Sequence, residues 1–355
     1  MTRIFEGDNM KTNTNAGKKY FGAANGYSGF RSNFDKIFSP TSLDKLFIIK
    51  GGPGTGKSTL MRRIREDFID DFDVTTILCS SDPDSLDGLL ISKDGKTVGI
   101  ADGTSPHTLD AKYPGAIEEI INLGDGFDFN KLQESRRDIM SLSENKKTKY
   151  ESAYSSLKIA GEIYHYITKC FLNYDYYNKA ENLISDFLSD ECMNGDNQII
   201  SNLLISSFSK NGYKRLPIFF ENKRKITIKG DGISEYILLS EIERKLNQKC
   251  CAHRFFPSAF SENIADIIET ESKIYMISDN SDCTVDSTVY MPKTCEYERL
   301  KIAYRCFIEN SQFSLIKASE YHFKLEDIYS SAIAFEKNEE KYTDIINKIN
   351  YIFDK

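Results

Sequence analysis

The chain lacks the short signatures of a zinc-binding, exported or membrane-spanning protein. Its eight cysteines are scattered, with no C-x-x-C pair and no His-Cys cluster at the spacing of zinc ligands, a pattern typical of thiols that stay reduced in a cytosol. No window approaches the 18 apolar residues that a membrane span needs, and residues 1–19 are mostly polar and carry no apolar stretch. The sequence therefore predicts a cytoplasmic chain that does not insert into a membrane.

The chain also has fewer basic than acidic residues. It contains 46 Lys and Arg residues and 53 Asp and Glu residues, for a formal net charge of -7. This balance works against broad electrostatic binding to nucleic acid. The 355 residues, 40% hydrophobic and 28% charged, are ordinary for a globular protein and predict about two domains.

One glycine-rich segment dominates the first half. Residues 51–58 read Gly-Gly-Pro-Gly-Thr-Gly-Lys-Ser, directly after the apolar run 46–49, and residues 57–68 have helical spacing without Gly or Pro. This strand, loop and helix order lets backbone N–H groups and the positive end of a helix converge on a phosphate. The alternative is a glycine-rich turn that merely resembles the motif. That alternative does not explain why a strand precedes the segment and a helix follows it.

The pattern assigns a role to each part of the segment. Lys57 is expected to reach the outer phosphates as a point charge, and Ser58 to supply one ligand to a magnesium ion. We expect the nucleotide to be held by Gly51, Gly52, Pro53, Gly54, Thr55, Gly56, Lys57, Ser58 and Thr59.

Acidic residues follow two further strand candidates. The strand 97–101 ends at Asp102, which we expect to hold the magnesium ion through water, while Ser58 supplies a ligand. No Asp-Glu pair follows it, so the base that activates water must lie elsewhere or hydrolysis must be slow. The candidate bases follow the strands 74–78 and 97–101 and are Asp82, Asp84, Asp87 and His107. We place Asp82 and Asp84 with Lys57 and Asp102 as catalytic residues, although a solvated turn explains that loop equally well.

The stretch from 128 to about 192 contains no proline, and its apolar residues recur at steps of three, four or seven. This predicts a helical arm, a hairpin of two long helices with a break near Asn173. The charged run 144–149 is interpreted as the solvated face or tip of the arm. A protein partner could bind there.

The second half repeats the first weakly. Residues 226–232 resemble 47–54, residues 274–277 resemble the strand before Asp102, and Leu315 and Ala318 resemble Leu157 and Ala160. Ser234-Glu235-Tyr236 stands where Lys57 and Ser58 would recur, and no glycine follows Gly232. We predict an active domain 1–195, with a boundary at the turn 194–197, and a degenerate domain 196–355 with C-terminal helices. Two unrelated α/β segments remain the alternative.

These segments, together with 79–88, 99–107 and 113–115, resemble an uncharacterised family of bacterial, mainly Firmicute, P-loop ATPases. The resemblance covers most of the chain. It implies an α/β fold, a duplicated three-layer P-loop sandwich in which each half carries a helical arm. The second half departs from the family because its loop has lost Lys and Ser.

The nucleotide is predicted to be ATP, because no Asn-Lys-x-Asp segment for guanine is present. No Leu-Ser-Gly-Gly-Gln segment of a transporter ATPase is present either. Three hypotheses remain: a magnesium-dependent ATPase that couples hydrolysis to a conformational change, a small-molecule or nucleotide kinase, and a non-hydrolysing ATP-dependent switch. An oligomer could complete the site with an arginine from a neighbour, such as Arg62, Arg63, Arg136 or Arg137.

Overall fold

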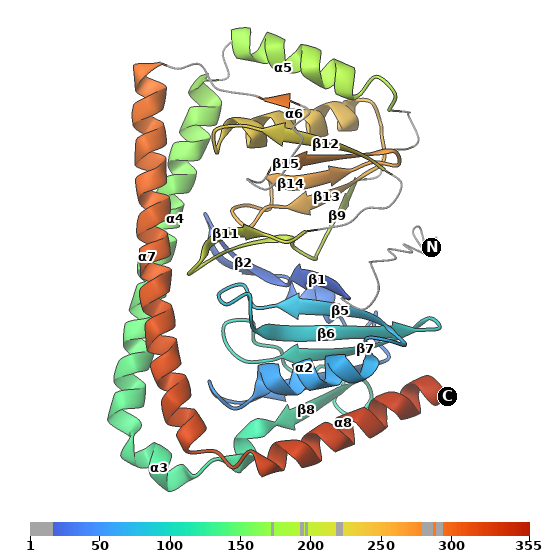
Figure 1. Ribbon diagram of the computed structural model, residues 1–355, viewed down its shortest axis with the longest axis vertical. Helices are drawn as coiled ribbons and strands as arrows, with labels where there is room; N and C mark the ends of the chain where they lie inside the picture. Colours follow the sequence, from blue (N-terminus) through green and yellow to red (C-terminus); the bar gives the residue numbers. More distant parts are fainter. Residues whose placement is uncertain are drawn as a thin grey trace.

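The computed structural model describes residues 17–171, 174–191, 195, 198–217, 223–278, 287–288 and 294–355. These residues form a mixed α/β structure with two six-stranded sheets, each containing parallel pairs (Figure 1). The predicted helix break at Asn173 and most of the predicted domain boundary, residues 194–197, lie outside the described residues.

The first sheet contains the strand that precedes the glycine-rich loop. Its strands, in spatial order, are β1 (Lys18–Phe21), β5 (Asp73–Leu78), β6 (Leu86–Lys93), β7 (Lys96–Asp102), β4 (Lys45–Lys50) and β8 (Glu118–Asn122). β4 runs parallel to both β7 and β8, β6 runs antiparallel to β5 and β7, and β1 runs parallel to β5.

The second sheet has the same order and the same pairing directions. Its strands are β9 (Gln198–Ile200), β13 (His253–Pro257), β14 (Ala265–Glu269), β15 (Lys273–Ile277), β12 (Arg224–Lys229) and β16 (Ser287–Thr288). β12 and β15 thus hold the places of β4 and β7, which is how the sequence comparison paired these segments. Each half also has an antiparallel hairpin, β2 (Ala23–Gly26) with β3 (Gly29–Ser32), and β10 (Ser206–Ser209) with β11 (Gly212–Arg215).

The two sheets face one another. Successive side chains of a strand point to opposite faces, so on β4 Phe47 and Ile49 pack with α2 (Lys57–Phe68) and α8 (Glu336–Asp354). Leu46 and Ile48 instead share a buried cluster with Ile267 of the second sheet and with the short helix α1 (Phe34–Ile37).

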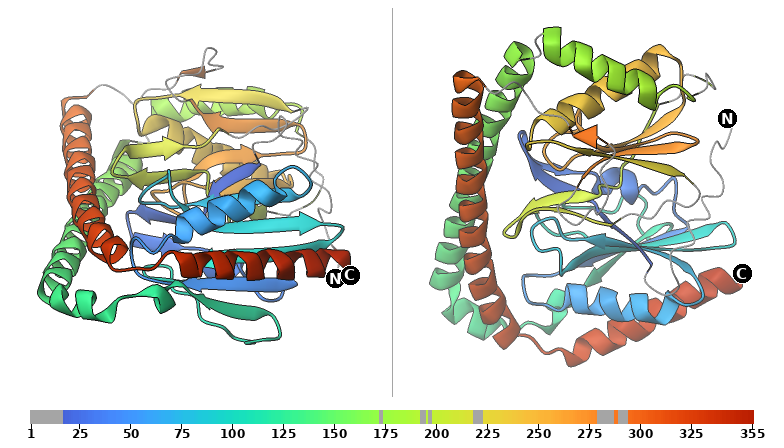
Figure 2. Two further views of the ribbon diagram at one scale, coloured as in Figure 1. Left: turned by 60° about the horizontal axis from the view of Figure 1, so that its bottom comes forward. Right: turned by 45° about the horizontal axis from the view of Figure 1, so that its top comes forward.

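The same alternation places α6 (Ser234–Gln248) on the outer face of the second sheet, where it packs with Tyr275 and Ile277. The longer helices α2, α8 and α6 thus pack on the outer faces of the two sheets, whereas the short helix α1 packs between the sheets (Figure 2, right). This four-layer arrangement differs from the three layers expected for each half. The inner face of each sheet is buried mainly by the other sheet, with α1 between them, so it needs no full helix layer of its own.

Long helices run along one edge of both sheets. After η1 (Leu123–Gly126) and α3 (Phe129–Glu134) comes α4 (Arg136–Phe171), which lies beside α7 (Cys295–Ser331) in both figures. The expected hairpin of two helices within 128–192 is therefore wrong. The partner of α4 is α7 from the second half, while α5 (Tyr174–Phe187) turns away and contacts α6. Helical periodicity reveals a buried face but not which helix covers it.

The helix that follows each long helix packs on the opposite half of the chain. α5 follows α4 of the first half and contacts α6 of the second, whereas α8 follows α7 of the second half and contacts α2 of the first (Figure 1). The C-terminal helix assigned by sequence to domain 196–355 is thus part of the core around α2, through Ile345 and Ile349. None of the described helices is long and apolar enough to span a membrane.

Candidate functional site

The glycine-rich loop connects β4 to α2 and turns through two left-handed residues. Gly54 has φ +67° and Gly56 has φ +86°, a region that side chains rarely adopt. Gly56 is the N-cap of α2 and no side chain caps the helix, whose first turn holds no acidic residue. The first amide groups of α2 therefore remain available to an anion, with the positive end of the helix dipole behind them.

Lys57 and Asp102 meet beside this loop. β4 and β7 are parallel neighbours with Ile49 paired to Asp102, so the two strands end at the same edge of the sheet. Lys57 Nζ donates to the carbonyl oxygens of Gly51 (3.2 Å) and Gly52 (2.9 Å) and lies 3.7 Å from Asp102 Oδ2. The structure thus brings together the two residues on which the sequence prediction depends most.

Asp102 is held in place by its own turn. Its Oδ1 accepts hydrogen bonds from the backbone N–H of Thr104 at 2.9 Å and from the Thr104 hydroxyl at 2.6 Å. The other carboxylate oxygen, Oδ2, faces Lys57. The hydrogen bonds to Oδ1 therefore orient the carboxylate so that Oδ2 faces the loop.

Ser58 lies on the first turn of α2, facing the strand β6. Its Oγ accepts a hydrogen bond of 2.9 Å from the backbone N–H of Leu86. A hydroxyl has two acceptor lone pairs, so one is left for a metal ion. Thr59 is exposed on the same turn, and its expected contact with nucleotide stays a prediction.

A buried histidine links Asp87 to Asp102. His107 Nδ1 lies 3.0 Å from the Asp102 carbonyl oxygen, and Nε2 lies 3.2 Å from Asp87 Oδ2. The ring stacks on Phe34 at 4.2 Å between centroids. Burial disfavours the charged ring, but the hydrogen bond and charge of Asp87, with the charge of Asp102, outweigh burial and raise the pKa of His107.

The raised pKa predicts how stability depends on pH. A group whose pKa is higher in the folded state stabilises the fold fully below its unfolded pKa, about 6.5 for histidine, and loses that contribution as pH rises through the folded pKa. We expect the free energy of unfolding to fall more between about pH 6 and about pH 9 in wild type than in His107→Gln. Urea unfolding of both proteins measures this. Equal pH dependence in the two proteins would contradict the charged pair.

The two acidic residues expected to act in catalysis, Asp82 and Asp84, interact with residues other than Lys57 and Asp102. Asp82 Oδ2 accepts from Lys210 Nζ at 3.0 Å, and Lys210 belongs to the turn of the second hairpin. Asp84 is exposed, and its backbone carbonyl accepts from Arg62 at 2.9 Å. Asp87, which lies in β6, is the member of this acidic group that the structure connects to Asp102 through His107.

The arm helix α4 carries Tyr150, which the sequence prediction placed in the apolar stripe, and Lys146, which it placed in solvent. Tyr150 is half-buried, and burial, with the charges of Cys79, Asp87 and Asp82, raises its pKa. Lys146 lies one turn earlier on the same face and is half-buried; burial, followed by the charge of Lys57, lowers its pKa. The run 144–149 lies inside α4 and so is not the tip of the arm. Its exposed members fit the expected solvated face, but Lys146 is half-buried. Its spacing from Tyr150, which belongs to the apolar stripe, was the available signal.

The end of α7 and the start of α8 cover the outside of the loop. A Cβ placed on Gly54 would lie 2.6 Å from the carbonyl oxygen of Glu326, and one on Gly52 would lie 3.3 Å from the ring of Tyr329. Asn338 Nδ2 donates to the Thr55 carbonyl at 3.0 Å. The link 332–334 is tied to 126–128 by backbone hydrogen bonds of 2.8 and 2.9 Å. The second half thus closes over the loop of the first.

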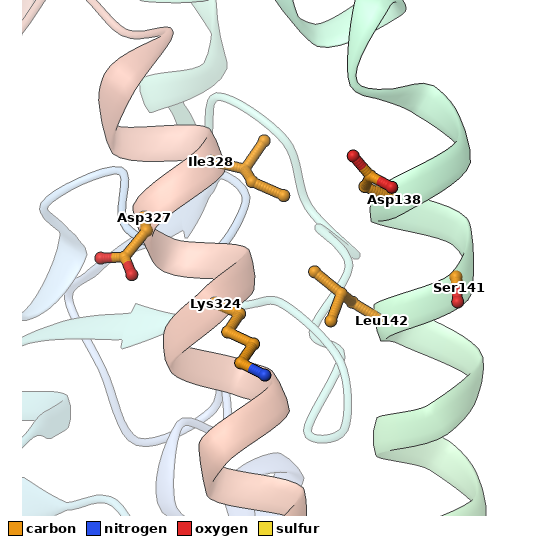
Figure 3. A pocket seen from close by; sticks show the side chains of 6 residues that line it. All are labelled: Asp138, Ser141, Leu142, Lys324, Asp327 and Ile328. Carbon is orange, nitrogen blue, oxygen red and sulfur yellow. The ribbon is translucent and has the colours of Figure 1, made fainter.

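The arginines considered as donors to the site are partly engaged. Arg63 makes two hydrogen bonds to Glu339 of α8, at 2.5 and 3.0 Å, and stacks on Tyr342. Arg136 lines an open hollow beside Tyr329. A second hollow, of about 340 Å³, lies between α4 and α7. Figure 3 shows Leu142 and Ile328 reaching into it. Neither hollow includes the glycine-rich loop.

The corresponding loop of the second half is filled by its own carboxylates. Both oxygens of Glu235 accept from the Gly232 N–H at 3.1 Å, and Asp231 Oδ1 accepts from the amides of Ile233 (3.3 Å) and Ser234 (3.2 Å). Burial raises the pKa of Glu235. Lys301 of α7 holds Asp231 Oδ2 at 3.1 Å. The amides that would bind a phosphate are thus already bound by the chain itself.

No protein-family model, curated protein or solved structure matches this chain. Its function is therefore inferred from the residues of the site.

Proposed function

We propose that this chain is a magnesium-dependent ATPase with a P-loop nucleotide-binding fold in its first half. The observation that carries the proposal is the uncapped start of α2, with Lys57 3.7 Å from Asp102 at the end of the parallel neighbouring strand. A helix N-terminus, a lysine and a nearby carboxylate together suit a polyphosphate with a bound cation.

The residues present suit magnesium held with a nucleotide. Ser58 keeps an unused lone pair, and Asp102 presents Oδ2 toward the loop while Oδ1 is occupied. Magnesium keeps several waters and takes few protein ligands when phosphates supply the rest. Among the described residues, no group of three or more His, Cys, Asp or Glu side chains is arranged to hold a metal ion. This set of donors agrees with a cation that arrives with the phosphates.

Each residue then has a part in the reaction. Lys57 neutralises charge on the outer phosphates, and a magnesium ion held by Ser58 and Asp102 would supply further positive charge there. The amides of α2 orient the chain of phosphates. We assign the positioning of Asp102 to Thr104 and His107. Asp87, hydrogen-bonded to His107, replaces Asp82 and Asp84 as the first candidate for handling a proton.

We further infer that the two halves arose by duplication, supported by the identical strand order and pairing directions of the two sheets. The second half serves as a scaffold, because Asp231 and Glu235 fill its loop. A switch is the second candidate function. It is favoured by the contacts of α7 and α8 with Gly54 and Thr55, through which nucleotide binding would reach the second half.

The test is phosphate release from magnesium-ATP by wild type and Lys57→Ala, alone and with pools of nucleosides, sugars and nucleic acids. The ATPase predicts phosphate release without any acceptor, abolished by Lys57→Ala. ADP formed without free phosphate, in one acceptor pool alone, would show a kinase instead. Tight binding with neither product would leave the switch.

A further inference from the structure

We propose that Phe335, at the start of α8, is the residue on which the base of the bound nucleotide stacks. Phe335 belongs to the second half of the chain, whereas the phosphates are held by residues 51–58 of the first half. This inference rests on the proposed function and deepens it, because it assigns to the second half a contact with the nucleoside.

The order of the strands gives the two ends of the phosphate chain different surroundings. β4, which leads into the loop, stands between β7 and β8 in the first sheet. Asp102 ends β7 and lies 3.7 Å from Lys57, the lysine that reaches the outer phosphates. The outer phosphates and the magnesium ion then lie on the β7 side of the loop. The nucleoside is joined to the other end of the chain, so we expect it on the β8 side.

The start of α8 lies on the β8 side of the loop. The element η1 follows β8 directly, and the backbone N–H of Ala334 donates to the carbonyl oxygen of Gly126 in η1 at 2.9 Å. Asn338 Nδ2 donates to the carbonyl oxygen of Thr55 in the loop at 3.0 Å. These bonds hold the first turn of α8 against both η1 and the loop.

Phe335 places an aromatic ring beside the first residue of this phosphate-binding helix. Gly56 is the N-cap of α2, and a Cβ placed on it would lie 3.6 Å from Cε1 and 3.8 Å from Cδ1 of Phe335. The side chain of Phe335 is 44% exposed. One part of the ring therefore borders the loop, while another part is accessible to a ligand.

Helix capping does not explain an aromatic residue at position 335. Phe335 is the N-cap of α8, and no side chain caps this helix. Ser, Thr, Asp and Asn are favoured at an N-cap because their side chains accept from the first N–H groups, which a phenyl ring does not do. The exposure of the ring also shows that it is not a core residue. An accessible ring beside a phosphate site suits a flat base, because stacking uses the π-face that every base has.

A structural role is the competing explanation, in which Phe335 maintains the shape of the loop by packing beside Gly56. The two explanations differ in which ligands a substitution affects. Inorganic tripolyphosphate carries the phosphates of ATP without the base, and the same loop would hold it. Loss of a structural residue weakens both ligands, whereas loss of a stacking residue weakens ATP alone.

The experiment is calorimetric titration of wild type, Phe335→Ala, Phe335→Tyr and the control Tyr351→Ala with magnesium-ATP and with magnesium-tripolyphosphate. Tyr351 is an exposed aromatic residue further along α8. We expect Phe335→Ala to weaken ATP binding by about 10-fold and to change tripolyphosphate binding by less than about 2-fold. Phe335→Tyr keeps the ring and binds ATP nearly as wild type does, and Tyr351→Ala matches wild type with both ligands.

An equal loss of affinity for ATP and tripolyphosphate in Phe335→Ala, or no loss for either ligand, overturns this inference alone, because wild type still binds ATP at the loop. Absence of ATP binding by wild type, or undiminished binding by Lys57→Ala, overturns the proposed function and this inference with it.

Discussion

Replacing Lys57 by alanine is expected to remove most of the affinity for magnesium-ATP, by about 30-fold or more. Lys57 Nζ is the ammonium group that the structure places at the loop, 2.9 Å from the Gly52 carbonyl and 3.7 Å from Asp102. Truncating one partner of a desolvated charge pair costs about 2 to 5 kcal/mol. Calorimetric titration of wild type and variant measures the change.

The matched control for Lys57→Ala is Lys93→Ala. Lys93 is an exposed lysine at the far end of β6, over the ring of Phe72, away from the loop. Its removal takes away one positive charge and leaves the site intact. If Lys57→Ala is folded and binds ATP as tightly as wild type and Lys93→Ala, the loop is not the nucleotide site.

The second large effect is expected from Asp102→Asn. Asparagine keeps an Oδ1 that accepts both hydrogen bonds from Thr104, so the turn is preserved, but it removes the charge that faces Lys57. We expect the apparent affinity for magnesium, measured by titration at fixed ATP, to fall by about 10- to 100-fold. The free energy of unfolding should change by only about 1 kcal/mol, because Lys57 retains its two carbonyl partners.

Magnesium titrations at fixed ATP compare Asp102→Asn with wild type, and Asp84→Asn serves as the control because Asp84 is exposed. A midpoint in Asp102→Asn equal to that of wild type would place the metal-binding carboxylate elsewhere. Asp87 is then the next residue to test, since His107 connects it to the same turn.

The sequence alone predicts the part of the site that local chain geometry determines. Lys57 and Ser58 follow a strand and a glycine-rich loop within a single continuous segment, so their relation depends on neighbouring residues only. Asp102 could be placed as well, because the ends of parallel strands meet at one edge of a sheet and β7 is the neighbour of β4.

The contributions of the arms could not be predicted in the same way. The spacing of Tyr150 and its neighbours shows that one face of α4 is buried, but α7 and the loop of Ser81 are distant in sequence. Nothing local indicates that Glu326 and Asn338 cover a loop near residue 54. The packing of one sheet on the other also depends on residues distant in sequence. The unbroken apolar run of β4 shows that both faces of the strand are buried, but not what buries them.

The central claim is that one magnesium-nucleotide binds per chain, at residues 51–58, because the second loop is filled by Asp231 and Glu235. Its most direct test is the stoichiometry of magnesium-ATP binding to wild type, measured by equilibrium dialysis with labelled ATP. The account predicts saturation at one ATP per chain, with the same value in Glu235→Gln. Saturation at two per chain, or no saturable binding, would contradict it.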